Sequence, residues 1–379
     1  MSDQIHAIVM PKWGLSMEEG TVVAWLAEQG VAVEAGADLI EIETSKINNV
    51  MESPAGGLLR RQVVGQGQTV AVGTLLAVVA DPLIDDVEVD RFIDQYEVVE
   101  PEGEQGESPS AEPQTVEAGG CLLSYVTAGS GDRPPVVFMH GFGGDSSNWL
   151  FNQPALAQNQ VTYSLDLPGH GRSSKQITEG DVPWMTGVVV DFFDKLGLGK
   201  AHLVGHSLGA AVCLNTAINE PGRIASVTLL CPAGLSKQIN IDYINGFINA
   251  DRRKQMKSVL AMLFADEKLV NREMVEQLLK YKRLDGVTAA LNTIAAAVFK
   301  DGQQSLVLSG RLNELEQSVV PVQVIWGKQD KVITPVNVDE LPASVAYHIL
   351  DEAGHMVHLE QSAQVNELIE TLVNTCGAS

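Results

Sequence analysis

The first eighty residues alternate short apolar runs with turns, and they show no helical period. Valine and isoleucine recur in the runs, and glycine recurs in the turns between them. Runs of this kind predict β-strands. The four clearest are IHAIVM, TVVAWLAE, DLIEIET and LLAVVA. The pattern therefore predicts an all-β domain over residues 1–80.

This domain contains an internal repeat with an offset of 37 residues. Turns that recur at a fixed offset predict two similar sheets related by an approximate twofold axis. Glycine suits such turns because it adopts positive φ without a steric penalty. The matching glycines are Gly20 with Gly57, Gly30 with Gly67, and Gly36 with Gly73.

Residues 81–118 separate this domain from the rest of the chain. Residues 81–98 have the spacing of a short amphipathic helix. Residues 99–115, VEPEGEQGESPSAEPQT, are acidic, contain several prolines and hold no apolar cluster. Such a segment buries too little apolar surface to order itself. We therefore expect a short helix followed by an acidic linker.

From residue 119 the pattern changes, because apolar strand-like runs now alternate with helix-like stretches. Buried runs separated by helices predict a mostly parallel sheet covered on both faces. Residues 236–310 interrupt the alternation with several consecutive helical patterns, which predict an inserted cap. The strand-like runs are PVVFMH, VTYSLDL, AHLVGH, SVTLLC, VQVIWG and AYHILD.

The composition excludes several classes of function. The chain has 25 Lys+Arg against 48 Asp+Glu, a formal net charge of -23, which opposes binding to nucleic acid or anionic lipid. Its four cysteines lack metal-type spacing, so we expect unpaired thiols and no metal site. No secretory signal and no apolar run long enough to span a membrane is visible. A cytoplasmic protein is the expectation.

Lys46 lies between the two halves of the repeat, in the run EIETSKINNVMESPAGG. In isolation, a lysine on an exposed turn is usually just solvated. The stretch from Met10 to Gly57, however, resembles the lipoyl domains of 2-oxo acid dehydrogenase complexes along nearly its whole length. The resemblance implies lipoate on Lys46. Biotin domains flank their lysine with methionines, whereas Ser45 and Ile47 flank it here.

A second motif, Gly205-His206-Ser207-Leu208-Gly209, follows the strand-like run AHLV and precedes a helix-like stretch. In that context the sharp turn raises the serine hydroxyl above the sheet as a nucleophile. The run HGFGG follows another strand-like run. It predicts that the backbone N–H of Phe142 joins that of Leu208 in holding an oxyanion.

The acid and the base of a triad follow later in the chain. Asp330 comes just after the run VQVIWG, and His355 comes on a turn after the last strand-like run. The order Ser, Asp, His is that of α/β-hydrolases. His358 and Asp351 are rivals, but His355 directly follows the strand end, and Asp351 is too close to His355 in sequence. We therefore predict that Ser207, Asp330 and His355 form the triad.

Residues 119–379 resemble the α/β-hydrolase superfamily. The stretch DLPGHGRSS is also typical of this superfamily. A lipoyl domain fused to such a domain resembles the dihydrolipoamide acetyltransferase component of bacterial acetoin dehydrogenase systems. That resemblance implies acetyl transfer from lipoate on Lys46 to coenzyme A. It also implies a complex with a thiamine-diphosphate E1 and a dihydrolipoamide dehydrogenase E3.

Two other functions stay open at this point. A carrier-tethered thioesterase or esterase would pass the acyl group to water, and a scaffold would use the hydrolase domain only for assembly. A basic cluster in the cap is a candidate for the phosphates of coenzyme A, although such clusters are usually solvated faces. The sequence leaves open whether the chain is a homo-oligomer. The cluster comprises Arg252, Arg253, Lys254 and Lys257.

Overall fold

The structure is a computed structural model that describes residues 5–11, 19–44, 48–94, 96 and 112–376. The chain divides into two compact units, the first comprising residues 1–107 and 271–274 and the second comprising residues 108–270 and 275–379. Each unit is described here by itself. Within the described residues, no helix has both the length and the apolar character needed to cross a membrane.

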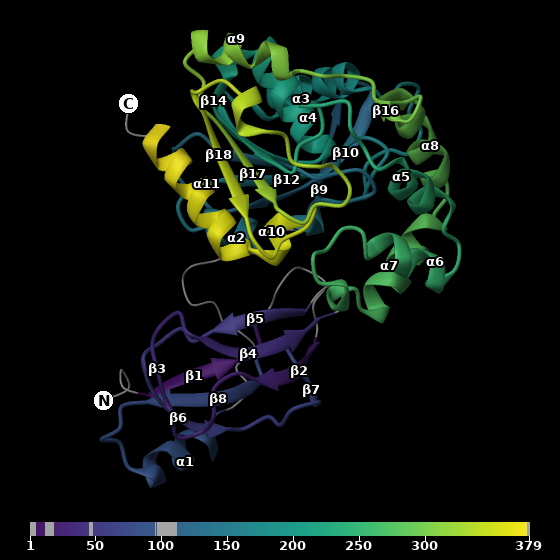
Figure 1. Ribbon diagram of the computed structural model, residues 1–379. Coiled ribbons are helices and arrows are strands. Elements are labelled where there is room, and N and C mark those ends of the chain that lie inside the picture. The colour runs from purple at the N-terminus through teal and green to yellow at the C-terminus, as the bar shows by residue number, and fades with distance from the viewer. Residues whose placement is uncertain (1–4, 12–18, 45–47, 95, 97–111, 377–379) are drawn as a thin grey trace. The chain divides into compact units, whose positions relative to one another are not determined.

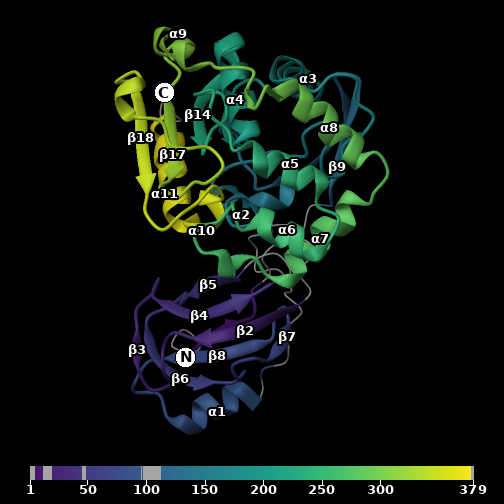
Figure 2. The same cartoon turned by 45° about the vertical axis from the view of Figure 1, so that its right-hand side comes forward.

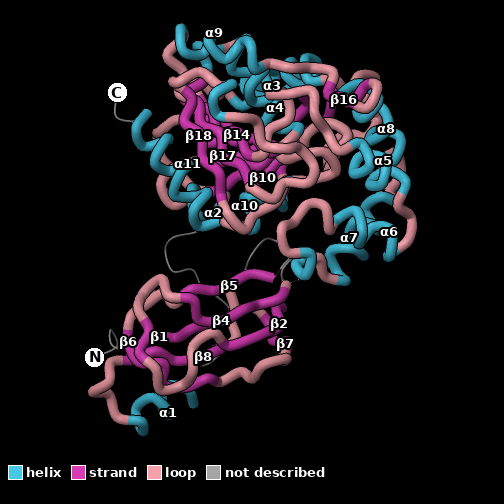
Figure 3. The backbone as a smooth tube through the Cα atoms, viewed as in Figure 1, coloured by secondary structure: helices cyan, strands magenta, loops and turns pink. Residues whose placement is uncertain are grey.

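The first unit is built from two four-stranded sheets, whose strands pair antiparallel. One sheet has the order β1-β8-β6-β3, and the other has the order β5-β4-β2-β7. Figure 3 shows this unit as strands with helix α1 at one end. The strands are β1 (Ile5–Val9), β2 (Glu19–Trp25), β3 (Ala32–Val33), β4 (Asp38–Glu43), β5 (Asn48–Glu52), β6 (Gly57–Gln62), β7 (Thr69–Ala71) and β8 (Leu75–Ala80).

The repeat of 37 residues corresponds to structure, because β2, β3 and β4 recur as β6, β7 and β8. At the matching turns Gly30 and Gly67 have φ of +92° and +82°, and Gly36 and Gly73 have φ of +83° and +84°. These values lie in the left-handed region that favours glycine. Side chains from both sheets, such as Ile42 and Leu76, form one buried core. The predicted all-β fold is confirmed.

Strands β4 and β5 pair antiparallel, and the register ends at Glu43 opposite Asn48. The short connection between these strands contains Lys46. Lys46 lies outside the residues that the structure describes.

Helix α1 (Asp86–Asp94) packs on the sheet that contains β1 and β8, through the fully buried Val89. Arg60 of β6 also bonds Asp86 at 2.6 Å. The helix is therefore part of the first unit, because its apolar stripe covers apolar side chains on the outer face of that sheet. The predicted linker, by contrast, falls largely outside the described residues.

The second unit has an eight-stranded sheet with the order β18-β17-β14-β13-β11-β12-β10-β9 (Figure 1). Neighbours from β18 to β12 run parallel, while β10 pairs antiparallel with β12 and with β9. Strand β9 begins inside the segment expected to be linker, because its backbone pairs with β10. The strands are β9 (Gln114–Ala118), β10 (Cys121–Ala128), β11 (Val136–Met139), β12 (Thr162–Leu165), β13 (Ala201–His206), β14 (Ile224–Leu230), β17 (Val322–Gly327) and β18 (Val345–Leu350).

Helices cover both faces of this sheet, with α3 and α4 on one side and α2 and α11 on the other (Figure 1, Figure 2). The central strands β11, β13 and β17 are accordingly buried at every position. This layering confirms the predicted α/β-hydrolase architecture. The helices are α2 (Gln153–Ala157), α3 (Val182–Leu196), α4 (Leu208–Asn219), α9 (Leu312–Gln317), α10 (Val357–Glu360) and α11 (Ser362–Cys376).

A helical cap lies between β14 and β17 in sequence, and Figure 3 shows its helices beside the sheet of the same unit. A two-stranded hairpin, β15 and β16, ends the cap. The cap contains α5 (Ile241–Asn249), α6 (Arg253–Leu260), α7 (Arg272–Lys282), α8 (Val287–Val298), β15 (Phe299–Lys300) and β16 (Gln303–Gln304).

Candidate active site

Ser207 occupies the sharp turn between β13 and α4. Its φ of 52° and ψ of -115° belong neither to the strand that ends at His206 nor to the helix that begins at Leu208. A non-glycine residue with positive φ stores strain, and such residues cluster at functional sites. The turn is held in place, because Ser207 N–H donates to Leu230 O at 3.0 Å and Ser207 O accepts from Ala233 N–H at 3.1 Å.

The glycines of the motif make this turn possible. A Cβ on Gly205 would lie 2.5 Å from Gly209 O, and a Cβ on Gly209 would collide with Met139 O. Only glycine allows backbones to approach this closely. The first turn of α4 therefore packs directly against β13 and the end of β11, which aims Ser207 away from the sheet.

The loop after β11 lies against the nucleophile. A Cβ on Gly141 would lie 3.1 Å from Ser207 Cβ, so the two backbones are in close contact. His140 fixes the loop, since its Nδ1–H donates to Gly141 O at 2.8 Å and its Nε2 accepts from Leu167 N–H at 3.0 Å. Burial lowers the pKa of His140, which keeps the ring neutral for both bonds.

Two backbone donors remain available beside Ser207. The N–H groups of Phe142 and Leu208 form no hydrogen bond with any residue in the described part of the chain. Buried backbone N–H groups without a partner are rare in native proteins. Leu208 directly follows the strained Ser207, and these two N–H groups are the donors that the sequence predicted for an oxyanion.

Asp330 and His355 form a hydrogen-bonded pair, with Nδ1 of the ring 2.8 Å from Oδ2 of the carboxylate. Both residues are buried, with exposed fractions of 8% and 2%. The carboxylate is fully engaged: Oδ1 accepts from the N–H groups of Val332 and Ile333, and Oδ2 also accepts from Trp326 Nε1 at 3.0 Å. An aspartate held in this way fixes the orientation and tautomer of the imidazole.

His206 links the nucleophile turn to the base. Its Nε2–H donates to His355 O at 2.9 Å, and the two rings lie 4.7 Å apart. The Ser207 hydroxyl forms no hydrogen bond with another described residue. Catalytic hydrogen bonds are often long without substrate and tighten when it binds. Burial holds the pKa of His206 well below its usual value, so this ring stays a neutral brace.

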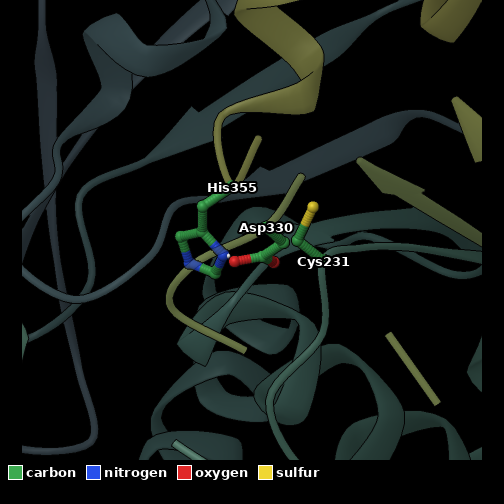
Figure 4. A group of neighbouring side chains, drawn as sticks. All are labelled: Cys231, Asp330 and His355. Carbon is green, nitrogen blue, oxygen red and sulfur yellow. Dashed lines mark hydrogen bonds and ion pairs between the residues drawn. The ribbon is translucent and has the colours of Figure 1, made fainter. Parts of the chain in front are cut away.

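Cys231 follows β14 and is a neighbour that sequence reasoning missed. Its sulfur, a carboxylate oxygen of Asp330 and a ring nitrogen of His355 lie within 4.8 Å of one another. Figure 4 shows the Asp330 carboxylate between the His355 ring and Cys231. Burial raises the pKa of the thiol well above its usual value, so it is not a nucleophile. Nothing in the residue pattern marks Cys231, because its position beside Asp330 and His355 follows from the order of the strands in the sheet.

The rival residues lie elsewhere. Asp351 is exposed and pairs with Lys328 at 2.5 Å, so it does not serve His355. His358 is fully buried and stacks on Trp149 with ring centroids 4.8 Å apart. Burial lowers the pKa of His358 to about 3. The structure thus brings Asp330, and not Asp351, to His355.

The cap covers the site. Phe247 of α5 and Phe299 of β15 contact the Phe142 ring, with centroids 6.0 and 5.9 Å away. Ser207 is 8% exposed. A buried serine with oxyanion donors and a paired histidine is equipped for acyl transfer, and the enclosure limits access of water.

Comparisons with known proteins agree with both units. A model described as the alpha/beta hydrolase fold matches residues 134–362, and a model described as a biotin-requiring enzyme matches residues 6–79. The dihydrolipoyllysine-residue acetyltransferase component of the acetoin cleaving system of Pseudomonas putida is 42% identical, over 96% of this chain and 97% of its own length. Its counterpart in Cupriavidus necator is 40% identical, over 98% of each chain.

A solved structure shows the same fold in the second unit. A serine hydrolase from Cycloclasticus zankles has 22% sequence identity and a TM-score of 0.64, covering 71% of this chain and 99% of that one.

Proposed function

Because the chain belongs to the family of dihydrolipoyllysine-residue acetyltransferase components of acetoin cleaving systems, we propose that it transfers an acetyl group to coenzyme A through Ser207. The observation that carries the proposal is the strained Ser207 turn beside two unpaired N–H donors and the Asp330–His355 pair. The family model over residues 6–79 supports a lipoyl domain upstream.

Lys46 is the proposed site of lipoate. Lys46 lies in the short connection between the paired strands β4 and β5, and the stretch around it resembles that of lipoyl domains. Lipoate at this position supplies a thiol that carries the acetyl group as a thioester. Tethering keeps that thioester at a high effective concentration near the second unit.

Acylation begins when Ser207 Oγ attacks the thioester carbonyl carbon and passes its proton to His355 Nε2. Asp330 keeps the proton on Nδ1 in place and stabilises the imidazolium. The N–H groups of Phe142 and Leu208 hold the negative oxygen of the tetrahedral intermediate, and removing one such donor typically costs about 3–4 kcal/mol. The C–S bond then breaks, and His355 protonates the departing sulfur.

Deacylation reverses these roles. His355 takes the proton of the coenzyme A thiol, and the sulfur attacks the acetyl ester of Ser207. Collapse of the second intermediate returns the proton to Ser207 Oγ and releases acetyl-CoA. The buried site under Phe247 and Phe299 favours the thiol over water as acceptor.

Replacement of the nucleophile tests the route. In the lipoylated protein, we expect Ser207→Ala to lower acetyl-CoA formation by several orders of magnitude while acetylation of the lipoyl arm is retained. Ser258→Ala, on the exposed face of α6, is the matched control and should match wild type. Near-normal transfer by Ser207→Ala would rule out the acyl-serine, and release of acetate by wild type without acetyl-CoA would identify a thioesterase.

Intact-mass measurement tests the attachment site. Protein isolated from its native host should carry one lipoyl increment, and Lys46→Arg should abolish it because the acylated amine is gone. A biotin increment, or a lipoyl increment that survives Lys46→Arg, contradicts the assignment.

The proposed setting is a multienzyme complex. The relatives are named as components of an acetoin cleaving system. We infer that this chain works with a thiamine-diphosphate E1, which acetylates the arm, and a dihydrolipoamide dehydrogenase E3, which reoxidises it. A bacterial cytoplasmic location goes with that proposal. Copurification of both activities with a tagged chain is the measurement that checks it.

A further inference from the structure

A polar pocket of about 420 Å³ lies on the outer side of the loop that carries Asp330. Its walls come from three segments of the second unit: residues 237–240 after β14, the turn between β15 and β16, and residues 331–334. This volume falls within the range of small-ligand sites. The pocket is separate from the Ser207 turn, but it shares a loop with the triad acid.

The charge of the pocket is opposite to that of the whole protein. The chain carries 48 acidic and 25 basic residues, yet the pocket lining includes Lys237 and Lys331 and no acidic residue. Lys331 pairs with Glu267 at 3.3 Å, and both side chains are substantially exposed. Exposed pairs of this kind contribute little and exchange readily. The lining therefore favours an anion.

The pocket also offers hydrogen-bonding groups without partners. Within the described residues, the Lys237 ammonium, the side-chain amides of Gln238 and Gln303, and the Thr334 hydroxyl form no hydrogen bond. These groups belong to residues from all three walls of the pocket. Ammonium, amide N–H and hydroxyl donors are what phosphate oxygens accept from.

The walls are preorganised. Gln304, which is 4% exposed, accepts from Gly234 N–H at 2.7 Å and donates to Gln238 O at 2.6 Å. Asn240 ties the first wall to the third, because its N–H donates to Val332 O at 2.8 Å and its side chain donates to Lys331 O at 2.9 Å. A rigid site loses less entropy when it binds a ligand.

The third wall connects the pocket to the chemistry. Val332 N–H donates to Asp330 Oδ1 at 2.8 Å, so one side of this loop holds the triad acid. The other side presents Lys331 and Thr334 to the pocket. A ligand anchored here by its anionic end therefore lies beside the loop that holds Asp330.

We propose that this pocket binds the phosphate groups of coenzyme A, with Lys237 and Lys331 as the principal cationic contacts. The inference rests on the proposed acetyl transfer to coenzyme A. The pocket differs from the basic cluster of Arg252, Arg253, Lys254 and Lys257 because it combines two lysines with side-chain amides and a hydroxyl that form no other hydrogen bond within the described residues.

The test compares coenzyme A with pantetheine, which has the same thiol arm without phosphates. For Lys237→Ala and Lys331→Ala, the preference for coenzyme A over pantetheine, measured as the ratio of kcat/KM values, should fall roughly tenfold each. Lys195→Ala, an exposed lysine in the last turn of α3, is the matched control and should keep the wild-type ratio. An unchanged ratio in the double variant Lys237→Ala/Lys331→Ala overturns the proposal.

Direct binding separates failure of the pocket from failure of the proposed function. Calorimetric titration of the full chain with coenzyme A needs no turnover. If wild type binds coenzyme A but forms no acetyl-CoA, the proposal of acetyl transfer fails. In that case the pocket is still supported as the phosphate site if the double variant binds coenzyme A at least tenfold more weakly than wild type. Equal binding of coenzyme A by wild type and the double variant, or no binding by wild type, refutes the pocket whatever the activity.

Discussion

Asp330→Asn is the substitution whose effect the structure defines most sharply. Oδ1 of Asp330 accepts from the N–H groups of Val332 and Ile333, whereas Oδ2 accepts from Trp326 Nε1 and His355 Nδ1. An asparagine keeps its single carbonyl oxygen on the two backbone donors. Its NH₂ group then faces the indole and the imidazole.

The NH₂ group must find an acceptor, and His355 Nδ1 is the atom within reach at 2.8 Å. The ring can accept there only in the tautomer that carries its proton on Nε2. That tautomer cannot take the proton of Ser207. Wrong-tautomer replacements in Ser-His-Asp triads cost roughly 10⁴ in kcat, which corresponds to about 5.5 kcal/mol. Trp326 retains a partner, because Nε1 also donates to Ile333 O at 3.1 Å.

The assay is steady-state formation of acetyl-CoA from acetyl-dihydrolipoamide, with thermal unfolding measured in parallel. We expect a loss of roughly 10⁴ in kcat with the fold intact, since the backbone bonds to Oδ1 remain. Asp351→Asn is the matched control, because within the described residues this exposed acid pairs with Lys328 alone, and the activity of this variant should stay within about twofold of wild type. Activity above a tenth of wild type for Asp330→Asn, or an equal loss for Asp351→Asn, would refute the assignment.

Three further predictions concern the oxyanion loop, helix α1 and the buried histidines. Gly141→Ala places a Cβ 2.8 Å from His206 Nδ1, so we expect kcat to fall roughly a hundredfold, and a wild-type rate would show that the loop adjusts freely. Val89 is fully buried, so Val89→Ala should destabilise the first unit by about 1–2 kcal/mol, measured by calorimetry of the full chain. The side chain of Val87 is 63% exposed, so Val87→Ala should have no effect. Equal effects of the two substitutions would contradict the packing of α1. His358 has its pKa lowered to about 3 by burial, so below about pH 6.5 the unfolded chain binds a proton that the folded chain excludes. The contribution of His358 to stability is therefore fully present above about pH 6.5, and it declines by about 1.4 kcal/mol per pH unit as the pH falls toward 3. Denaturant titrations should show a smaller decline for His358→Gln, and an identical slope would disprove this contribution.

Local sequence patterns predicted the parts of this protein that depend on short-range constraints. The glycine repeat indicated two matched sheets because positive φ at a turn nearly requires glycine, and Gly30 and Gly67 have that conformation. The motif around Ser207 likewise indicated a strained strand-to-helix turn. At Gly209 a side chain would collide with the end of β11, so the motif carries its geometry within five residues.

Other features depend on contacts between residues that are distant in the chain. That α1 belongs to the first unit follows from the sheet on which Val89 packs, and a helical period alone gives no partner. The same holds for β9, whose polar sequence resembled linker until β10 supplied backbone partners.

The surroundings of the site were decided by the order of strands in the sheet. Because β14 lies between β13 and β17, Cys231 meets Asp330, and the loop after Asp330 meets residues 237–240 to form the lysine pocket. Sequence determined which residues are candidates for the nucleophile, the acid and the base, since each role requires a particular functional group at a strand end. Tertiary structure decided which of them meet, because contact between residues 100 positions apart is fixed by sheet topology and packing, which no local pattern encodes.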